Sequence, residues 1–380
     1  MRSEWKTIRI GDFCQTNINT YSEKEKWEEI HYLDTGNITR GTIAEIQRLI
    51  PGIDKLPSRA RRKVQTNDIV YSTVRPNQRH YGIITESDPQ MLVSTGFAVI
   101  TVDLQIADPY YIYYFLSQDD VVETLHAIGE QSTSAYPSIK PSDIENLEIV
   151  LPSLEVQQAV GKLLRTVDAK IIVNEKINDN LLQQVYALFD AWFVSFIQTN
   201  GEMPADWHEG TLGDIATITS GKRPPMKQTA ASADVTIPLV GAASIMGFTN
   251  AVLYNEPILV TGRVGTHGII QRFQAPCWTS DNTLVIKSDF YEYTFQVLQR
   301  VDYANMNRGS TQPLITQTDL KNVSIIIPTE EALLEYEKLA GSLMVMYESN
   351  RKENERLEAL RDALLPRLMS GEIDVTNIEI

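Results

Sequence analysis

The chain has 380 residues, 43% of them hydrophobic, and a formal net charge of −15 from 34 Lys and Arg against 49 Asp and Glu. This length suffices for two or three globular domains, and the acidic balance taken alone argues against a nucleic-acid partner. Two cysteines and five scattered histidines exclude a disulfide framework and do not indicate a structural metal site.

The pattern of apolar residues indicates neither a membrane-spanning helix nor a signal peptide. No apolar run reaches the roughly 18 residues that a membrane helix needs. The start, MRSEWKTIRIGDF, lacks the apolar core of a signal peptide. We therefore expect a cytoplasmic protein that does not contact a membrane.

The first predicted domain covers residues 1–152. Runs of β-branched residues separated by turn residues alternate with a few helical stretches such as 108–125. This pattern predicts an α+β (mixed α/β) domain with a largely antiparallel or mixed sheet.

Residues 55–81 carry seven Lys or Arg against one acid, Asp68, a local balance of +6. The chain is therefore electrostatically divided, because residues 329–380 carry twelve acids against six bases.

A stretch at the end of this domain recurs 176 residues later. Residues 134–152 read SAYPSIKPSDIENLEIVLP, and residues 310–328 read STQPLITQTDLKNVSIIIP. Seven of the nineteen positions are identical: Ser134/Ser310, Pro137/Pro313, Ile139/Ile315, Asp143/Asp319, Asn146/Asn322, Ile149/Ile325 and Pro152/Pro328. Upstream, WKTIRIGD at Trp5 matches WHEGTLGD at Trp207, at an offset of 202, so the first copy is 26 residues longer between these anchors. Two copies at so long a period indicate domain duplication, with a second domain at 201–328.

A long segment without proline follows each copy, from Ser153 to Met203 and from Thr329 to Leu365. Ser153 and Thr329 suit helix N-caps, and Pro366 and Gly371 suit the end of the second helix. We expect two long helices, one within 153–200 and one within 329–380. Some 40 helical residues would reach about 60 Å.

The apolar residues of both segments step by alternating threes and fours, which is the seam of a coiled coil. Each seam carries two asparagines at its middle, and a buried asparagine selects a register in which it meets another polar group. We expect the helices to pair antiparallel with Asn174 near Asn354 and Asn178 near Asn350, because both pairs of numbers sum to 528 and share one pseudo-twofold centre. The alternative is that these asparagines lie on solvated faces.

The order of domain, helix, domain and helix resembles the specificity subunit of type I restriction-modification systems over essentially the whole chain. The motifs that carry the resemblance are the Gly-Asp start of each half, the SxxPxIxxxDIxN-like strand, the helix starts LPSLEVQQ and IPTEEALL, and the closing LLPRLMSGEI. The resemblance implies two target recognition domains, each reading one half of a split double-stranded DNA sequence. It also implies that the helices act as a spacer ruler and as docking surface for two modification (methyltransferase) subunits, which restriction subunits can join. The chain itself would need no cofactor.

On this resemblance, the basic part of the first domain is the expected DNA-facing surface. Arginine commonly pairs with guanine, asparagine or glutamine with adenine, and any cation can meet a phosphate. We expect phosphate contacts from Arg59, Arg61, Arg62 and Lys63, and base contacts from Arg75, Asn77, Gln78, Arg79 and His80. The alternative is a solvated basic loop.

Expected DNA contacts in the second domain are Lys222, Arg223, Lys227, Arg263, His267 and Arg308. The turns ahead of the repeated strand, 129–137 and 307–313, contain Gly, Ser and Thr residues that allow close approach to a phosphate. We therefore also expect DNA contacts from Tyr136 in the first of these turns, and from Arg308 and Gln312 in the second. An ordinary Ser/Thr-rich loop is the alternative. The two domains differ in length and in their loops, so we expect an asymmetric target.

Two other functions compete with DNA reading. The chain could be an enzyme with degenerate motifs, but its sequence shows no phosphate-cradling Gly-rich Lys-Ser/Thr loop, no Gly-x-Ser-x-Gly elbow and no His-Glu-x-x-His. It could also be a decoy that binds methyltransferase subunits without reading DNA. The basic segment at 55–81 weighs against the decoy.

Overall fold

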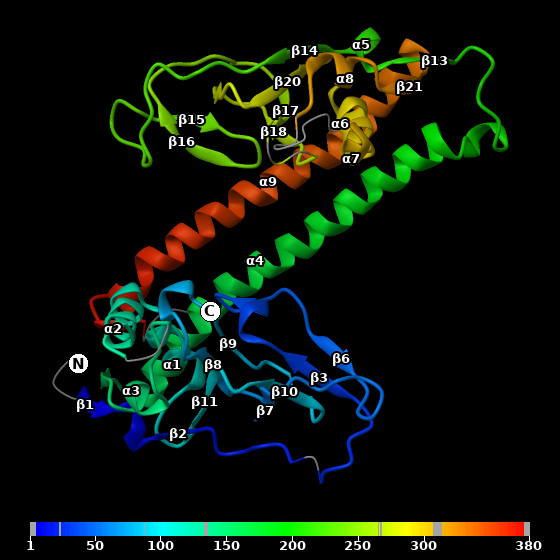
Figure 1. The fold of residues 1–380 in the computed structure, drawn as a ribbon. Helices are drawn as coiled ribbons and strands as arrows, with labels where there is room; N and C mark the ends of the chain where they lie inside the picture. Colours follow the sequence, from blue (N-terminus) through cyan, green and yellow to red (C-terminus); the bar gives the residue numbers. More distant parts are fainter. Residues whose placement is uncertain are drawn as a thin grey trace. The chain divides into compact units, whose positions relative to one another are not determined.

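A computed structural model describes residues 5–22, 24–86, 88–132, 136–264, 266, 268–306 and 314–375. The chain forms two compact units, unit 1 (Met1–Val173 with Glu353–Ile380) and unit 2 (Asn174–Lys352). The long helices α4 (Leu154–Phe189) and α9 (Glu330–Met369) contribute residues to both units (Figure 1). The division therefore cuts through the helices, whereas the sequence suggested boundaries at their ends.

Unit 1 contains two four-stranded sheets and two smaller strand pairs. The first sheet has the order β2 (Cys14–Thr16), β11 (Phe97–Val102), β8 (Ile69–Ser72), β9 (Tyr81–Ile83), and the second has the order β6 (Gln47–Leu49), β3 (Ile30–Leu33), β10 (Met91–Ser94), β7 (Ala60–Lys63). The pairs are β1 (Lys6–Arg9) with β12 (Glu148–Leu151) and β4 (Ile38–Thr39) with β5 (Thr42–Ile43). Helices α1 (Pro109–Ser117), α2 (Asp119–Glu130) and α3 (Pro141–Glu145) complete the unit.

Unit 2 repeats this topology. The order β14 (Thr217–Ser220), β20 (Thr283–Lys287), β17 (Ile258–Gly262), β18 (Gln271–Phe273) corresponds to the first sheet of unit 1, and β16 (Ile245–Thr249), β15 (Ile237–Val240), β19 (Trp278–Thr279) to the second. In each unit one strand pair is parallel, β3 with β10 and β15 with β19. Strands β13 (His208–Thr211) and β21 (Ser324–Ile327) pair as β1 and β12 do, and the helices are α5 (Leu212–Ile215), α6 (Tyr291–Gln299), α7 (Tyr303–Met306) and α8 (Gln317–Lys321).

The recurring Gly-Asp motif has a packing reason. A Cβ atom on Gly11 would lie 3.2 Å from the carbonyl oxygen at the end of α3, and one on Gly213 would lie 3.2 Å from the carbonyl oxygen at the end of α8. The neighbouring carboxylates close the same turn, because Asp12 accepts the Arg9 amide at 3.2 Å and Asp214 accepts the Thr211 amide at 2.7 Å. The motif is therefore structural in both copies.

Both long helices lie within the expected ranges, but one of the expected end signals does not act as one. Helix α4 ends at Phe189, and a π-helical turn (Asp190–Val194) and a short 3-10 helix (Ile197–Thr199) follow. Helix α9 continues through Pro366, so the expectation that this proline helps to end the helix is wrong. Leu368 and Met369 are buried in the core of unit 1, and this packing holds the last turn despite the lost proline N–H. Gly371, with φ of +68°, follows the helix end in the left-handed region.

Each unit packs its sheets against one section of both helices. In unit 1, Val160 and Leu164 of α4 share a core with Leu365 and Leu368 of α9. In unit 2, residues from the end of α4 and the start of α9 share a core: Val185, Phe189, Leu333, Tyr336 and Ala340. The start of α4 thus meets the end of α9 in unit 1 and the reverse holds in unit 2, which is the antiparallel pairing that the seam predicts.

The asparagines lie in this seam. In unit 2, Asn350 Nδ2 donates to Asn178 Oδ1 at 3.0 Å, the contact expected for these two residues, and Asn178 Nδ2 donates to the Tyr347 carbonyl at 3.2 Å. In unit 1, Asn354 Nδ2 donates to the Ile171 carbonyl at 3.3 Å. Asn174 is fully buried, so it does not lie on a solvated face. Because Asn174 and Asn354 belong to different units, their pairing stays a prediction.

Glu337 gives unit 2 a pH dependence. Its carboxylate accepts the backbone amides of Glu292 at 3.0 Å and Tyr293 at 2.8 Å, and burial raises the pKa of Glu337 to about 7. A raised carboxyl pKa stabilises the fold below the ordinary pKa near 4.5, and this stabilisation is lost as the pH rises through 7. Relative to Glu337→Gln, we expect the free energy of unfolding of unit 2 to fall by about 3 kcal/mol between pH 4.5 and pH 8. Urea denaturation of both proteins across this range measures the difference, and parallel curves would contradict it.

Candidate nucleic-acid interface

The structure brings two of the predicted DNA-facing segments together, and it does so in the same way in both units. In unit 1 the residues after β8 meet the turn before α3 through a β-bridge between Val74 and Ser138. In unit 2 the residues after β17 make the equivalent bridge, Val264 to Leu314. One arginine stands beside each bridge, Arg75 in unit 1 and Arg263 in unit 2. Sequence comparison suggested this correspondence only weakly, because the intervening lengths differ.

In unit 1 this junction continues into a tight turn. Residues Pro76–Gln78 form one 3-10 turn, and the flanking Arg75 (φ 48°) and Arg79 (φ 59°) both adopt the left-handed conformation. Each such residue costs about 1 kcal/mol or more, so the surrounding contacts must hold the turn. They include a 2.8 Å hydrogen bond from the Arg75 amide to the Pro137 carbonyl and a 2.9 Å bond from the Arg79 amide to the Pro76 carbonyl.

The side chains of this turn divide into two groups. Arg75 lies over the ring of Tyr136 at 4.6 Å, and this ring is 57% exposed. Asn77 and Gln78 are exposed. Arg79 forms an ion pair with Asp119 at 2.8 Å, and the His80 ring donates to the Ile38 carbonyl at 2.6 Å. Arg79 and His80 are therefore engaged within the protein, and their contact with bases stays a prediction.

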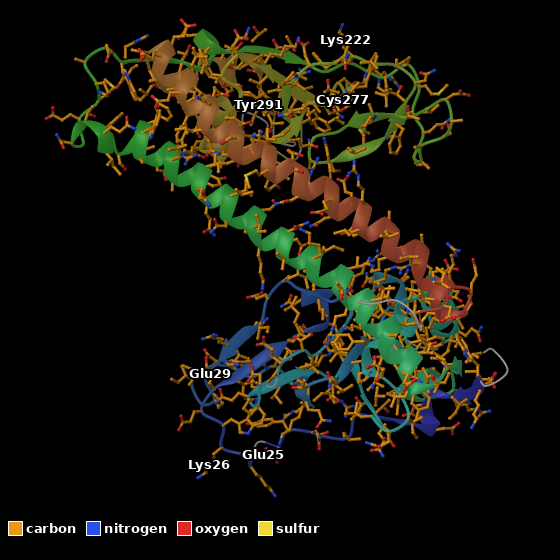
Figure 2. The ribbon with its side chains drawn as sticks, turned by 180° about the vertical axis from the view of Figure 1, so that it is seen from behind. Glu25, Lys26, Glu29, Lys222, Cys277 and Tyr291 are labelled. Atoms are coloured by element: carbon orange, nitrogen blue, oxygen red, sulfur yellow. The ribbon has the colours of Figure 1, made fainter. Side chains whose placement is uncertain are left out.

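The basic run before this turn is a strand and not a loop. Arg61, Arg62 and Lys63 belong to β7, at one edge of the second sheet, and Arg59 precedes it. Arg61, Arg62 and Lys63 are all half-buried, and a β-bulge between Ala60 and Arg62 interrupts the alternation of side chains along β7. Lys63 forms an ion pair with Glu25, which lies at the margin of unit 1 (Figure 2). Arg59 is exposed, the Arg62 Nε is buried and Lys63 is engaged by Glu25, so Arg59 and Arg61 remain the best candidates of the run for phosphate contact.

The unit 2 candidates are more scattered. Lys222, Arg223 and Lys227 are exposed and precede the second sheet, and Lys222 lies at the margin of the unit (Figure 2). The Trp278 indole donates to the Lys222 carbonyl at 2.7 Å, which fixes the backbone there. Arg263 is half-buried beside the bridge. His267, Arg308 and Gln312 lie outside the described residues.

Sequence reasoning missed Arg40. This exposed arginine stands at the tip of the β4–β5 hairpin, and its amide donates to the Arg79 carbonyl at 2.9 Å, so it borders the Arg75–Arg79 turn. Its side chain has no hydrogen bond or ion pair to any other residue in the described part of the chain. The signal was present as Ile-Thr-Arg-Gly-Thr, because β-branched residues around a turn pair ending in glycine predict a hairpin.

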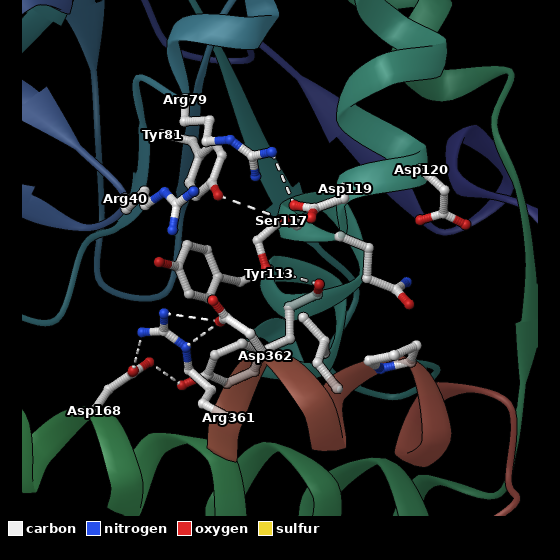
Figure 3. A pocket seen from close by; sticks show the side chains of 14 residues that line it. Arg40, Arg79, Tyr81, Tyr113, Ser117, Asp119, Asp120, Asp168, Arg361 and Asp362 are labelled. Carbon is white, nitrogen blue, oxygen red and sulfur yellow. Dashed lines mark hydrogen bonds and ion pairs between the residues drawn. The ribbon is translucent and has the colours of Figure 1, made fainter. Parts of the chain in front are cut away.

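Unit 1 also encloses a cavity of about 260 Å³ beside this surface (Figure 3). Asp168 of α4 accepts hydrogen bonds from Arg361 Nη1 of α9 at 2.8 Å and from the Tyr114 hydroxyl of α1 at 2.5 Å. Burial and the Asp168 carboxylate raise the pKa of Tyr114, so this hydroxyl stays protonated. The network joins α1 of unit 1 to both long helices, and Asp168 provides the buried side of Arg361 with a counterion.

In the described ranges, neither a metal centre nor a membrane span accompanies this surface. Among the residues that the structure describes, no three His, Cys, Asp or Glu side chains are placed to hold a metal ion. Over the same residues, no helix has both the length and the apolar character to cross a membrane.

Comparison with known proteins identifies the family. The family model described as "Type I restriction modification DNA specificity domain" matches residues 2–183 and 204–359. The HindI specificity subunit of Haemophilus influenzae is 22% identical, covering 98% of this chain and 100% of that protein, and the MjaIX specificity subunit of Methanocaldococcus jannaschii is 26% identical over 70% of both. The S subunit of a type I system from M. genitalium has the same fold, with a TM-score of 0.62, 16% identity and 96% coverage of both chains. The chain belongs to the type I restriction-modification DNA specificity family.

Proposed function

We propose that this chain reads an asymmetric, two-part double-stranded DNA target and directs adenine methylation and cleavage that partner subunits carry out. As a family member it is the non-catalytic recognition component. The observation that carries the proposal is the duplicated junction, in which an arginine after β8 or β17 lies next to the bridge to Ser138 or Leu314, ahead of the repeated strand. Each unit would use this junction on one half of the target, because one domain can read only a few base pairs.

The two half-sites of the DNA target should differ in sequence because the two junctions differ in structure. Unit 1 has the β4–β5 hairpin and the basic strand β7, and neither has a counterpart among the described strands of unit 2. Arg40 and Arg61 belong to these additional elements and Arg59 directly precedes β7, so phosphate contacts would be denser in unit 1. The acidic remainder does not oppose this reading, since phosphate contacts act locally.

The helices offer surface for protein partners. On α4, Ile172 and Val173 of unit 1 are 47% and 49% exposed, and on α9, Val345 and Met346 of unit 2 are 69% and 54% exposed. Exposed apolar residues on helices indicate protein contact. We propose that two methyltransferase subunits bind here, that restriction subunits can join them, and that the complex works in the cytoplasm.

Replacing Arg59 and Arg61 together by glutamine tests DNA reading against the decoy function. A reader should lose affinity for double-stranded DNA, and the slope of log K against log salt should fall by about two, because each lost phosphate contact removes about 0.9. Titration of the complex with the modification subunit onto labelled DNA, at four salt concentrations, measures the slope.

The matched control is Arg48→Gln. Arg48 is exposed on β6, at the opposite edge of the same sheet from β7, so its loss changes the charge without touching the proposed surface. We expect a nearly unchanged slope. If the double variant binds DNA as the unaltered chain does, Arg59 and Arg61 are not phosphate contacts. If neither protein binds DNA while both bind the modification subunit, the decoy function is favoured.

A further inference from the structure

Of the five side chains in the Arg75–His80 turn that were predicted to contact bases, three have partners within the protein and two have none in the part of the chain that the structure describes. The ion pair with Asp119 engages Arg79, the Ile38 carbonyl engages His80, and the Tyr136 ring supports Arg75. Asn77 and Gln78 are exposed, and neither amide has a hydrogen-bonding partner in the described ranges of the chain. The turn therefore presents two adjacent primary amides at its tip, with the exposed Arg40 beside them.

This turn is held in place before any ligand arrives. Two left-handed residues flank it, and hydrogen bonds to the β4–β5 hairpin and to the Pro137 carbonyl fix both of its ends. A rigid turn loses little conformational entropy when its side chains bind, so two short amides at its tip can discriminate between ligands.

The chemistry of a primary amide indicates the ligand. An Asn or Gln amide donates to N7 and accepts from the N6 amino group of adenine in the major groove, and no other base offers this pair of groups. Phosphate, by contrast, offers only acceptors, and a carboxamide carries no charge to attract it.

We propose that Asn77 and Gln78 are the adenine-reading tip of unit 1, so that the half-site read by this unit contains an A·T base pair contacted in the major groove. This inference rests on the proposed function. Arg75 is a positioning residue here, since its stacking on Tyr136 and its backbone bond to Pro137 set the direction of the turn.

The test uses the full chain in complex with its modification subunit and a pool of random double-stranded oligonucleotides. Sequencing of the bound fraction gives the preferred base at every position. For Asn77→Ala/Gln78→Ala we expect one or two A·T positions of one half-site to lose their preference by roughly tenfold to a hundredfold, with the other half-site unchanged. The unchanged half-site also shows that the variant is folded.

Two further substitutions sharpen the result. Asn77→Asp should move the preference at one position from adenine toward cytosine, because a carboxylate accepts from the cytosine N4 amino group. Gln105→Ala removes an exposed amide beyond the opposite end of the first sheet, since residues after β11 follow Val102 while the turn follows Ser72. It should leave the whole motif unchanged.

The outcomes separate the two proposals. If the unaltered complex enriches no motif, the proposed function fails. If it enriches a two-part motif and Asn77→Ala/Gln78→Ala leaves every position as it was, or if the positions that lose their preference are G·C pairs, the adenine-reading tip is overturned while DNA reading stands.

Discussion

Glu292→Ala is expected to lower the free energy of unfolding of unit 2 by about 3–5 kcal/mol. Arg272 Nη1 and Nη2 donate to the two oxygens of Glu292, at 2.6 Å each. Their side chains are only 8% and 6% exposed, and the guanidinium also lies over the rings of Tyr291 and Phe295. Removing one partner leaves a buried charge without its counterion, which costs much more than the pair contributes. Chemical denaturation followed by tryptophan fluorescence measures the change.

Two control proteins identify the cause. Arg272→Met/Glu292→Leu removes both charges and keeps the volume, so it should recover most of the lost stability. Glu256→Ala breaks an ion pair with Lys287 in the same unit, where the side chains are 52% and 38% exposed, and it should cost less than about 1 kcal/mol. If Glu292→Ala and Glu256→Ala have equal effects, the Arg272–Glu292 pair is not the buried support that its geometry indicates.

Lengthening both long helices is expected to change the number of base pairs between the two half-sites and to leave the sequences of the half-sites unchanged. Seven residues inserted between Lys176 and Ile177 in α4, and seven between Arg351 and Lys352 in α9, keep the heptad seam and the shared pseudo-twofold centre. Each insertion adds about 10 Å of helix, which corresponds to about three base pairs. Mapping of methylated adenines in cells that express the variant with its modification subunit gives both half-sites and the gap between them.

The control for this experiment places the same seven residues after Gly201, in the connection between the 3-10 helix and β13. This insertion leaves both helices intact, so the gap should stay constant. A changed base sequence in either half-site after the helix insertion, or an unchanged gap between the half-sites, would show that the helices do not set the spacing.

Much of the architecture was predictable because its signals are local. The repeated stretch predicts the duplication, and the structure bears this out with equivalent pairs β1–β12 and β13–β21 in the two copies. The threes-and-fours spacing predicts the seam that buries Leu164, Ile171 and Val185. The end of α4 was not predictable, because Phe193 packs against Tyr293 and Tyr336, which are distant in sequence.

The candidate site was predictable only as a region. Composition identified the basic segment and the turn before the repeated strand, and the structure joins them through the bridge from Val74 to Ser138. Which side chains are available to DNA depends on partners far along the chain, such as Asp119 for Arg79 and Glu25 for Lys63. Such contacts leave no periodic signal in a single sequence, so the exposed Asn77 and Gln78 could not be separated from their engaged neighbours.

The most direct test of the account is a genome-wide map of methylated adenines after co-expression of this chain with its modification subunit in a host that lacks adenine methylation. The account predicts one asymmetric motif made of two short words separated by a constant gap. Methylation at a single continuous word, or none despite a stable complex of the two proteins, would contradict it.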